Sequence, residues 1–194
     1  MVRRKITFSP PSAQTTPSAP DSVRLYGRAP FSLALVHGGP GARGSLAGAA
    51  AQIGRTRGVV EPLQTRGDIP ALLEELDAQL SLSTDRWTLA GHSWGAWLCL
   101  LYAAYFPKRV KQLVLIACPP LSESFVPQIL QRRLAALTQP QAAAFTRALH
   151  DLQSTPENPQ ALHTVEIFTR QTDFVNPCPY DDHLLEIDAR QYRQ

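Results

Sequence analysis

The chain has 194 residues and a formal net charge of +3, without long runs of Lys or Arg. This length suits one domain with a core of its own, and the small charge excess does not indicate nucleic acid or an anionic membrane as a partner. No stretch approaches the roughly 20 apolar residues that span a bilayer. No apolar signal-peptide core follows the basic start either, so we expect a cytoplasmic protein.

Strands and helices are predicted to alternate through the first 120 residues, after a flexible leader at 1–22 that is rich in Pro, Ser and Thr. Short apolar runs predict strands at 22–27, 31–38, 58–63, 86–91 and 110–118. Helical spacing predicts helices at 45–53, 68–80 and 96–106. This alternation predicts an α/β fold with a mainly parallel sheet flanked by helices.

The sequence also predicts two helix caps and the burial of two elements. Ser45 and Asp68 are predicted to cap the first two helices. The helix at 96–106 is apolar on nearly every side and the run at 110–118 is apolar throughout, so both are expected to be buried.

The pattern changes after residue 120. Residues 121–194 contain three amphipathic helical stretches separated by prolines, at 125–138, 140–152 and 158–171, with no buried strand after them. We therefore expect three parts: the leader at 1–22, an α/β core at 23–120, and a helical segment at 121–194 that does not return to the sheet. The cysteines Cys99, Cys118 and Cys178 are widely spaced and predict free thiols.

A serine stands between two glycines in Gly91-His92-Ser93-Trp94-Gly95. A nucleophilic serine at a sharp strand-to-helix turn needs glycine at positions −2 and +2, because side chains there would clash with neighbouring backbone. A strand is predicted before Ser93 and an apolar helix after it. The alternative is a chance occurrence of the pattern in a packed corner. As the first amide of the helix, Trp94 N–H would donate to an oxyanion.

A glycine-rich loop at 36–45 permits two interpretations. Its Gly39-Pro40-Gly41-Ala42-Arg43-Gly44 has the spacing of a dinucleotide-binding loop, with Glu61 ending the next strand as a possible ribose ligand. Pro40 weakens that interpretation because it removes a backbone N–H from the turn. The other interpretation is an oxyanion loop, with Gly39 N–H as the second donor and Gly38 or Gly41 as alternatives.

Together, "LVHGGPG" and "LAGHSWGAWLCLLYAAYFPKRVKQLVLIACPP" resemble the α/β-hydrolase family, in particular its proline-iminopeptidase-like branch. The resemblance covers roughly residues 31–194. It implies Ser93 as the nucleophile, an oxyanion hole from the Gly39 region and Trp94, and a helical cap over residues 121–194. It implies no metal and no organic cofactor.

The acid and the histidine of a Ser-acid-His triad are not identified. The family carries them after two strands that follow the cap, and the sequence shows neither strand. His183 next to Asp181-Asp182 is a weak candidate, and His37, His92, His150 and His163 are poorer ones. We therefore expect a C-terminally incomplete serine hydrolase of impaired activity.

The expected reaction is acyl transfer to water from an ester or a small amide or peptide. One alternative is a non-catalytic binding fragment, whose unfinished sheet edge would favour self-association or a complementing chain. A second alternative is a dinucleotide-binding domain. Glu166 and Glu186 could meet a substrate amine, although surface charges are the simpler interpretation.

Overall fold

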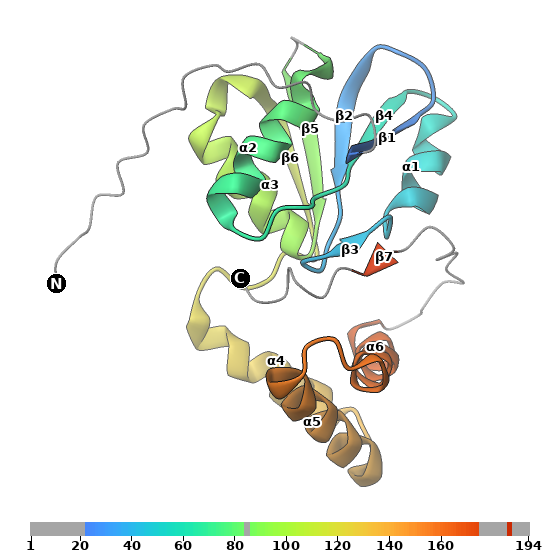
Figure 1. The fold of residues 1–194 in the computed structure, drawn as a ribbon, viewed down its shortest axis with the longest axis vertical. Helices are drawn as coiled ribbons and strands as arrows, with labels where there is room; N and C mark the ends of the chain where they lie inside the picture. The colour runs from blue at the N-terminus through green and yellow to red at the C-terminus, as the bar shows by residue number, and fades with distance from the viewer. Residues whose placement is uncertain (1–21, 84–85, 175–185, 188–194) are drawn as a thin grey trace, which may run out of the picture.

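The computed structural model describes residues 22–83, 86–174 and 186–187, so the predicted leader lies almost wholly outside the described residues. At its centre is a five-stranded sheet (Figure 1). Its strands are β1 (Val23–Tyr26), β2 (Phe31–Val36), β4 (Gly58–Pro62), β5 (Trp87–His92) and β6 (Val110–Ile116), in the order β1-β4-β2-β5-β6. Only β1 is antiparallel to its neighbour, so the predicted mainly parallel α/β fold is confirmed.

Three helices flank this sheet: α1 (Ala47–Gly54), α2 (Ile69–Gln79) and α3 (Trp94–Tyr105). Alternate residues of β2 point to opposite faces, as a strand requires. Leu33 and Leu35 pack with Ala50 of α1, whereas Ala34 and Val36 belong to the larger core that α2 and α3 cover. The two faces of the sheet therefore each have a core.

Of the two predicted helix caps, one is confirmed and one is wrong. Asp68 precedes α2, and its Oδ1 accepts the backbone N–H of Ala71 at 2.9 Å. Ser45 does not cap α1, because Leu46 occupies the cap position and no side chain accepts a hydrogen bond there.

A helical unit follows the sheet. It consists of α4 (Val126–Ala135), α5 (Gln139–Ser154) and α6 (Pro159–Asp173), close to the three predicted stretches. Phe145 of α5 is fully buried and meets the ring of Phe168 of α6 edge-on, 6.2 Å between centroids. This unit lies beyond the carboxyl ends of the parallel strands (Figure 1).

A second, two-stranded sheet was not predicted. It pairs β3 (Ala42–Arg43) with β7 (Glu186–Ile187) in antiparallel fashion. β7 thus brings a segment that follows the helical unit back to the glycine-rich loop, although not to the main sheet. Strands of two residues carry no periodicity, so no sequence pattern marks them.

Two expectations of burial are wrong. On β6, Val114, Leu115 and Ile116 are 38%, 42% and 46% exposed. On α3, the residues Trp97, Leu101 and Tyr105 lie on one outer face and are also exposed. The reason is position, because β6 is an edge strand that pairs only with β5. Among the described helices, none is long and apolar enough to span a membrane.

Candidate active site

Ser93 lies at the turn that joins β5 to α3, between the last strand residue His92 and the first helical residue Trp94. Its backbone has φ 53° and ψ −122°, a conformation that residues other than glycine rarely adopt. Its N–H donates to the carbonyl of Ile116 on β6 at 2.8 Å. The predicted sharp strand-to-helix turn is therefore present at this serine.

The glycines two residues before and after Ser93 have no room for a side chain. A Cβ on Gly91 would lie 2.3 Å from the carbonyl oxygen of Gly95. A Cβ on Gly95 would lie 2.3 Å from the carbonyl oxygen of His37 and 2.4 Å from that of Val36. Because these obstacles are backbone atoms, neither contact could be relieved by turning a side chain. Gly91 thus lets the end of β5 pack against the start of α3, and Gly95 lets the turn pack against the end of β2.

The glycine-rich loop lies beside Ser93. A Cβ built on Gly38 would lie 3.2 Å from the Cβ of Ser93 and 3.1 Å from Nδ1 of His92. The next residues turn sharply: Gly39 has φ 120°, Gly41 has φ 88°, and the Gly39–Pro40 peptide is cis. The loop closes with the N–H of Ala42 donating to Gly38 O at 3.3 Å. The oxyanion roles of Gly39 and Trp94 remain predictions.

His37 is fully buried where β2 meets this loop. Its Nδ1 lies 2.9 Å from the carbonyl oxygen of Gly38, and its Nε2 lies 3.3 Å from the backbone nitrogen of Gln64. A neutral ring with its proton on Nδ1 satisfies both contacts. Burial lowers the pKa of His37 to about 4. With both nitrogens occupied, His37 is not available as a base for Ser93.

No other described histidine is placed as a base. His92 adjoins Ser93 in sequence as the last residue of β5, and among the described residues no hydrogen bond joins the two side chains. Burial lowers the pKa of His92. His150 and His163 are exposed on the helical unit. His183 and the two aspartates before it lie outside the described residues. Within the described part of the chain, Ser93 therefore has no histidine–carboxylate pair beside it.

Two glutamates considered from sequence have structural partners. Glu61 is fully buried at the end of β4 and accepts the hydroxyl of Tyr26 at 2.8 Å, and burial raises its pKa. A buried carboxylate cannot reach a ribose, which argues against the dinucleotide interpretation. Glu186 forms ion pairs with Arg24 at 3.1 Å and Arg43 at 3.0 Å. Its ion pair with Arg43 links β7 to the glycine-rich loop. The two residues are far apart in the sequence, so no sequence pattern indicates this contact.

Glu75 of α2 was also missed. Its carboxylate accepts the N–H and hydroxyl of Thr65, at 2.9 and 2.5 Å, and the N–H of Arg66 at 3.4 Å. The neighbouring Gln64 donates to His37, so Glu75 holds the segment that supports the loop beside Ser93. A single glutamate on the surface of a helix has no sequence pattern that would predict such hydrogen bonds to a neighbouring segment.

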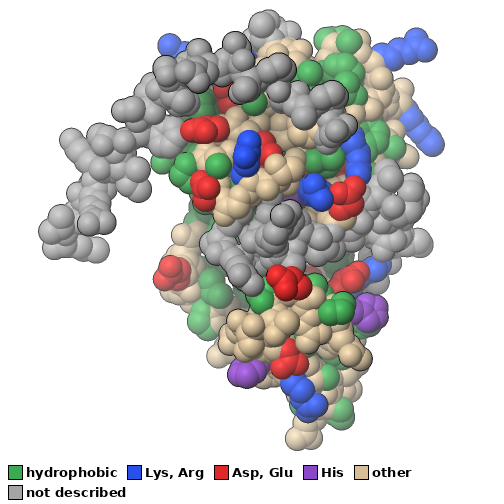
Figure 2. Space-filling model, viewed as in Figure 1, with side chains coloured by type: hydrophobic (Ala, Val, Ile, Leu, Met, Phe, Trp, Pro, Cys, Tyr) green, Lys and Arg blue, Asp and Glu red, His purple; other side chains and the backbone are tan. Residues whose placement is uncertain are grey.

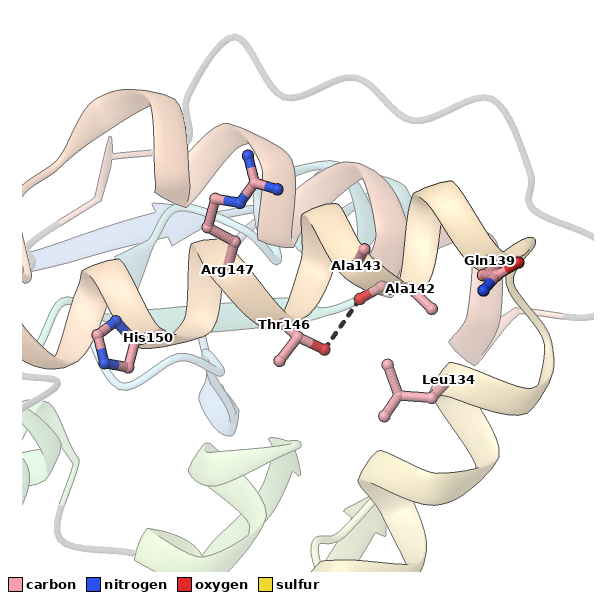
Figure 3. A pocket seen from close by; sticks show the side chains of 7 residues that line it. All are labelled: Leu134, Gln139, Ala142, Ala143, Thr146, Arg147 and His150. Carbon is pink, nitrogen blue, oxygen red and sulfur yellow. Dashed lines mark hydrogen bonds between the residues drawn. The ribbon is translucent and has the colours of Figure 1, made fainter.

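A separate apolar groove lies on the helical unit (Figure 3). Leu134 of α4 faces a row of α5 side chains that includes Ala142, Ala143 and Thr146, with Arg147 and His150 further along. The hydroxyl of Thr146 donates to the Ala142 carbonyl at 2.9 Å. None of the residues around Ser93 lines this groove.

The comparisons with known proteins agree with this geometry. A family model described as "alpha/beta hydrolase fold" matches residues 65–156. The solved structure of VinJ is similar over 88% of this chain, with 23% identity and a TM-score of 0.63. A proline iminopeptidase from Mycobacterium smegmatis is similar over 76%, with 22% identity and a TM-score of 0.54. No protein of curated function matches the chain in sequence.

The chain therefore has the α/β-hydrolase fold, and the family model described by that fold matches part of it, residues 65–156. The similar proteins are longer. This chain covers 64% of VinJ and 56% of the proline iminopeptidase.

Proposed function

We propose that this protein is a serine hydrolase in which Ser93 attacks the carbonyl carbon of an ester or a small amide or peptide. The observation that carries the proposal is the backbone of Ser93, held at φ 53° on the turn between β5 and α3. Strain of this kind persists only where surrounding structure enforces it, and it gathers at reactive residues. Here the backbone segments that pack closely at Gly91 and Gly95 surround the turn and hold it in place.

The oxyanion of the tetrahedral intermediate would be stabilised by backbone amides. Trp94 is the first residue of α3, and the N–H groups of a first helical turn have no acceptor within the helix. The partial positive charge of this helix end favours an anion. The second donor in the proposal is Gly39 N–H, from the loop whose preceding residue Gly38 lies against Ser93.

The general base is the missing part of this proposal. A serine hydroxyl needs a base to lose its proton, and the described residues place none beside Ser93. We therefore expect slow turnover of esters by the 194-residue chain. Binding and oxyanion stabilisation alone leave roughly 10³–10⁴-fold acceleration over water in hydrolases that lack triad members.

The test uses a fluorophosphonate probe, with the labelled residue identified by mass spectrometry. We expect slow labelling of the wild-type chain at Ser93, because no described base activates its hydroxyl, and none in Ser93→Ala. Ser81→Ala is the matched control and should label as the wild type does, since Ser81 lies on the short helical turn after α2. A folded wild-type chain that resists the probe, or labels equally in Ser93→Ala, contradicts the proposal.

The substrate class is tested with two chromogenic compounds, p-nitrophenyl acetate and proline p-nitroanilide. The likeness to a proline iminopeptidase supports including the second. Hydrolysis of either compound that disappears in Ser93→Ala supports the proposal, and the preferred compound separates esterase from aminopeptidase chemistry.

A second candidate function is binding through the exposed edge of the sheet. Val114, Leu115 and Ile116 of β6 form an exposed apolar edge of the sheet. We propose a second copy of the chain as its partner. Two β6 strands related by a twofold axis run antiparallel, which keeps the exposed Lys108 and Lys111 of each copy at opposite ends of the contact.

A further inference from the structure

A polar pocket lies at the amino ends of the parallel strands, at the opposite end of the sheet from Ser93. Residues 27–30 and Ser32, around the turn from β1 to β2, form one wall, and residues 54–58, around the connection from α1 to β4, form the other. Three exposed arginines line it: Arg28 from the first segment, and Arg55 and Arg57 from the second. Figure 2 shows basic side chains gathered at the upper right, where Figure 1 shows these loops.

Close backbone packing fixes the two walls relative to each other. A Cβ on Gly27 would lie 2.4 Å from the carbonyl oxygen of Arg57, and a Cβ on Gly58 would lie 2.6 Å from that of Arg28. Gly27 also has φ 77°, a conformation that glycine adopts easily. The backbone positions from which Arg28 and Arg57 extend are therefore set by the fold.

Within the described part of the chain, nothing neutralises the charges in this pocket. No described Asp or Glu lines it. Among the described residues, no carboxylate pairs with Arg28, Arg55 or Arg57, whereas Arg24, Arg43, Arg109, Arg133 and Arg170 all form ion pairs. Three positive charges in one concave site produce a local field that attracts multiply charged anions.

The carboxyl end of α1 gives a simpler reason for two of these arginines. A helix carries partial negative charge at that end, which stabilises nearby cations such as Arg55 and Arg57. It does not explain Arg28, which comes from a different segment and lines the same pocket. The helix end therefore does not account for three arginines from two segments lining one pocket.

We propose that this pocket binds the diphosphate group of a small molecule. A guanidinium presents paired N–H donors that match the oxygens of a phosphate, and a diphosphate brings enough negative charge for three arginines. The exposed hydroxyl of Ser32 adds a donor in the pocket. The backbone N–H groups of Arg55, Thr56 and Arg57 already donate to Gln52 and Ile53, so side chains make the contacts.

The experiment titrates the full chain with inorganic pyrophosphate by calorimetry in 150 mM salt. We expect saturable binding at one site, weakened about fivefold by Arg28→Gln and by Arg57→Gln. Arg132→Gln is the control, because it removes the same charge from an exposed position on α4. Its affinity should stay within about twofold of the wild type. Circular dichroism melting curves check that each variant is folded.

Other arms identify the ligand. ADP binding as tightly as pyrophosphate supports a site for the diphosphate alone, and tighter ADP binding supports a nucleotide as its source. The proposal is overturned if pyrophosphate does not saturate the protein, or if orthophosphate binds equally well. It is also overturned if Arg132→Gln weakens binding as much as the pocket variants, since the effect would then be one of net charge.

Discussion

The strands β2 and β6 both contain an apolar run, but β2 lies inside the sheet and β6 lies at its edge. β2 reads FSLALV and β6 reads VKQLVLI, and both runs predict a buried strand. In β2, Leu35 is 4% exposed and Val36 is fully buried, whereas in β6 Leu115 and Ile116 are 42% and 46% exposed. β2 has β4 on one edge and β5 on the other, while β6 has only β5.

An apolar run therefore indicates that a strand is suited to burial. Whether its side chains are in fact buried depends on the position of the strand in the sheet. Val114 of β6 is paired in register with Ala90 of β5, so both point to the same face. Ala90 packs beside Leu33 and Leu35 in the core under α1. Val114 lies one strand further out and remains exposed. The same substitution, leucine to lysine, is therefore expected to affect stability differently in β2 and in β6.

The largest effect is expected for Leu35→Lys in β2. A lysine at this position places an ammonium group in a packed apolar core without a partner. The free energy of unfolding should fall by more than about 4 kcal/mol, measured by urea denaturation, or the variant should fail to fold. Leu35→Met is the control, and should cost less than about 1.5 kcal/mol. A stable Leu35→Lys variant would show that this core is loosely packed.

The next effect concerns His37, directly after β2. Its folded-state pKa of about 4 is below the 6.5 expected in the unfolded chain, so folding favours the neutral ring. This contribution is complete above pH 6.5 and is lost as the pH falls from 6.5 towards 4. It amounts to roughly 3 kcal/mol for a fully buried ring.

The measurement is the free energy of unfolding by urea at several pH values. His37→Asn should flatten the slope between pH 6.5 and 4, whatever its own stability. An unchanged slope in His37→Asn would mean that the ring is not held neutral at the end of β2.

The sequence predicted much of the fold because its strongest signals are local. The Asp68 cap, the alternation of strands and helices, and the turn at Ser93 each depend on a few neighbouring residues. The role of Gly91 and Gly95 could also be predicted, because any strand-to-helix turn of this kind lacks space for a side chain at these two positions.

What the sequence did not reveal depends on distant segments. Glu186 reaches Arg24 across 162 positions, and Glu75 supports a loop ten positions away that in turn holds His37. Charged residues suit many partners, and only the folded chain selects one. Ser45 shows the converse: its type suits a helix cap, but α1 begins at Ala47, two residues later.

The smallest effect on stability is expected for Leu115→Lys in β6. Leu115 is 42% exposed, so a lysine there can reach water along its flexible stem. The free energy of unfolding should change by less than about 1 kcal/mol, in contrast to Leu35→Lys.

If two copies associate through β6, the same variant should dissociate them, because each copy would place an added positive charge in the apolar contact. Sedimentation velocity over a range of concentrations measures this, with Leu82→Lys as the control, since Leu82 is 50% exposed on the helical turn after α2. A wild-type chain that stays monomeric at every concentration, or dimers that survive Leu115→Lys, would contradict pairing through β6 and leave the exposure of this strand without an oligomeric cause.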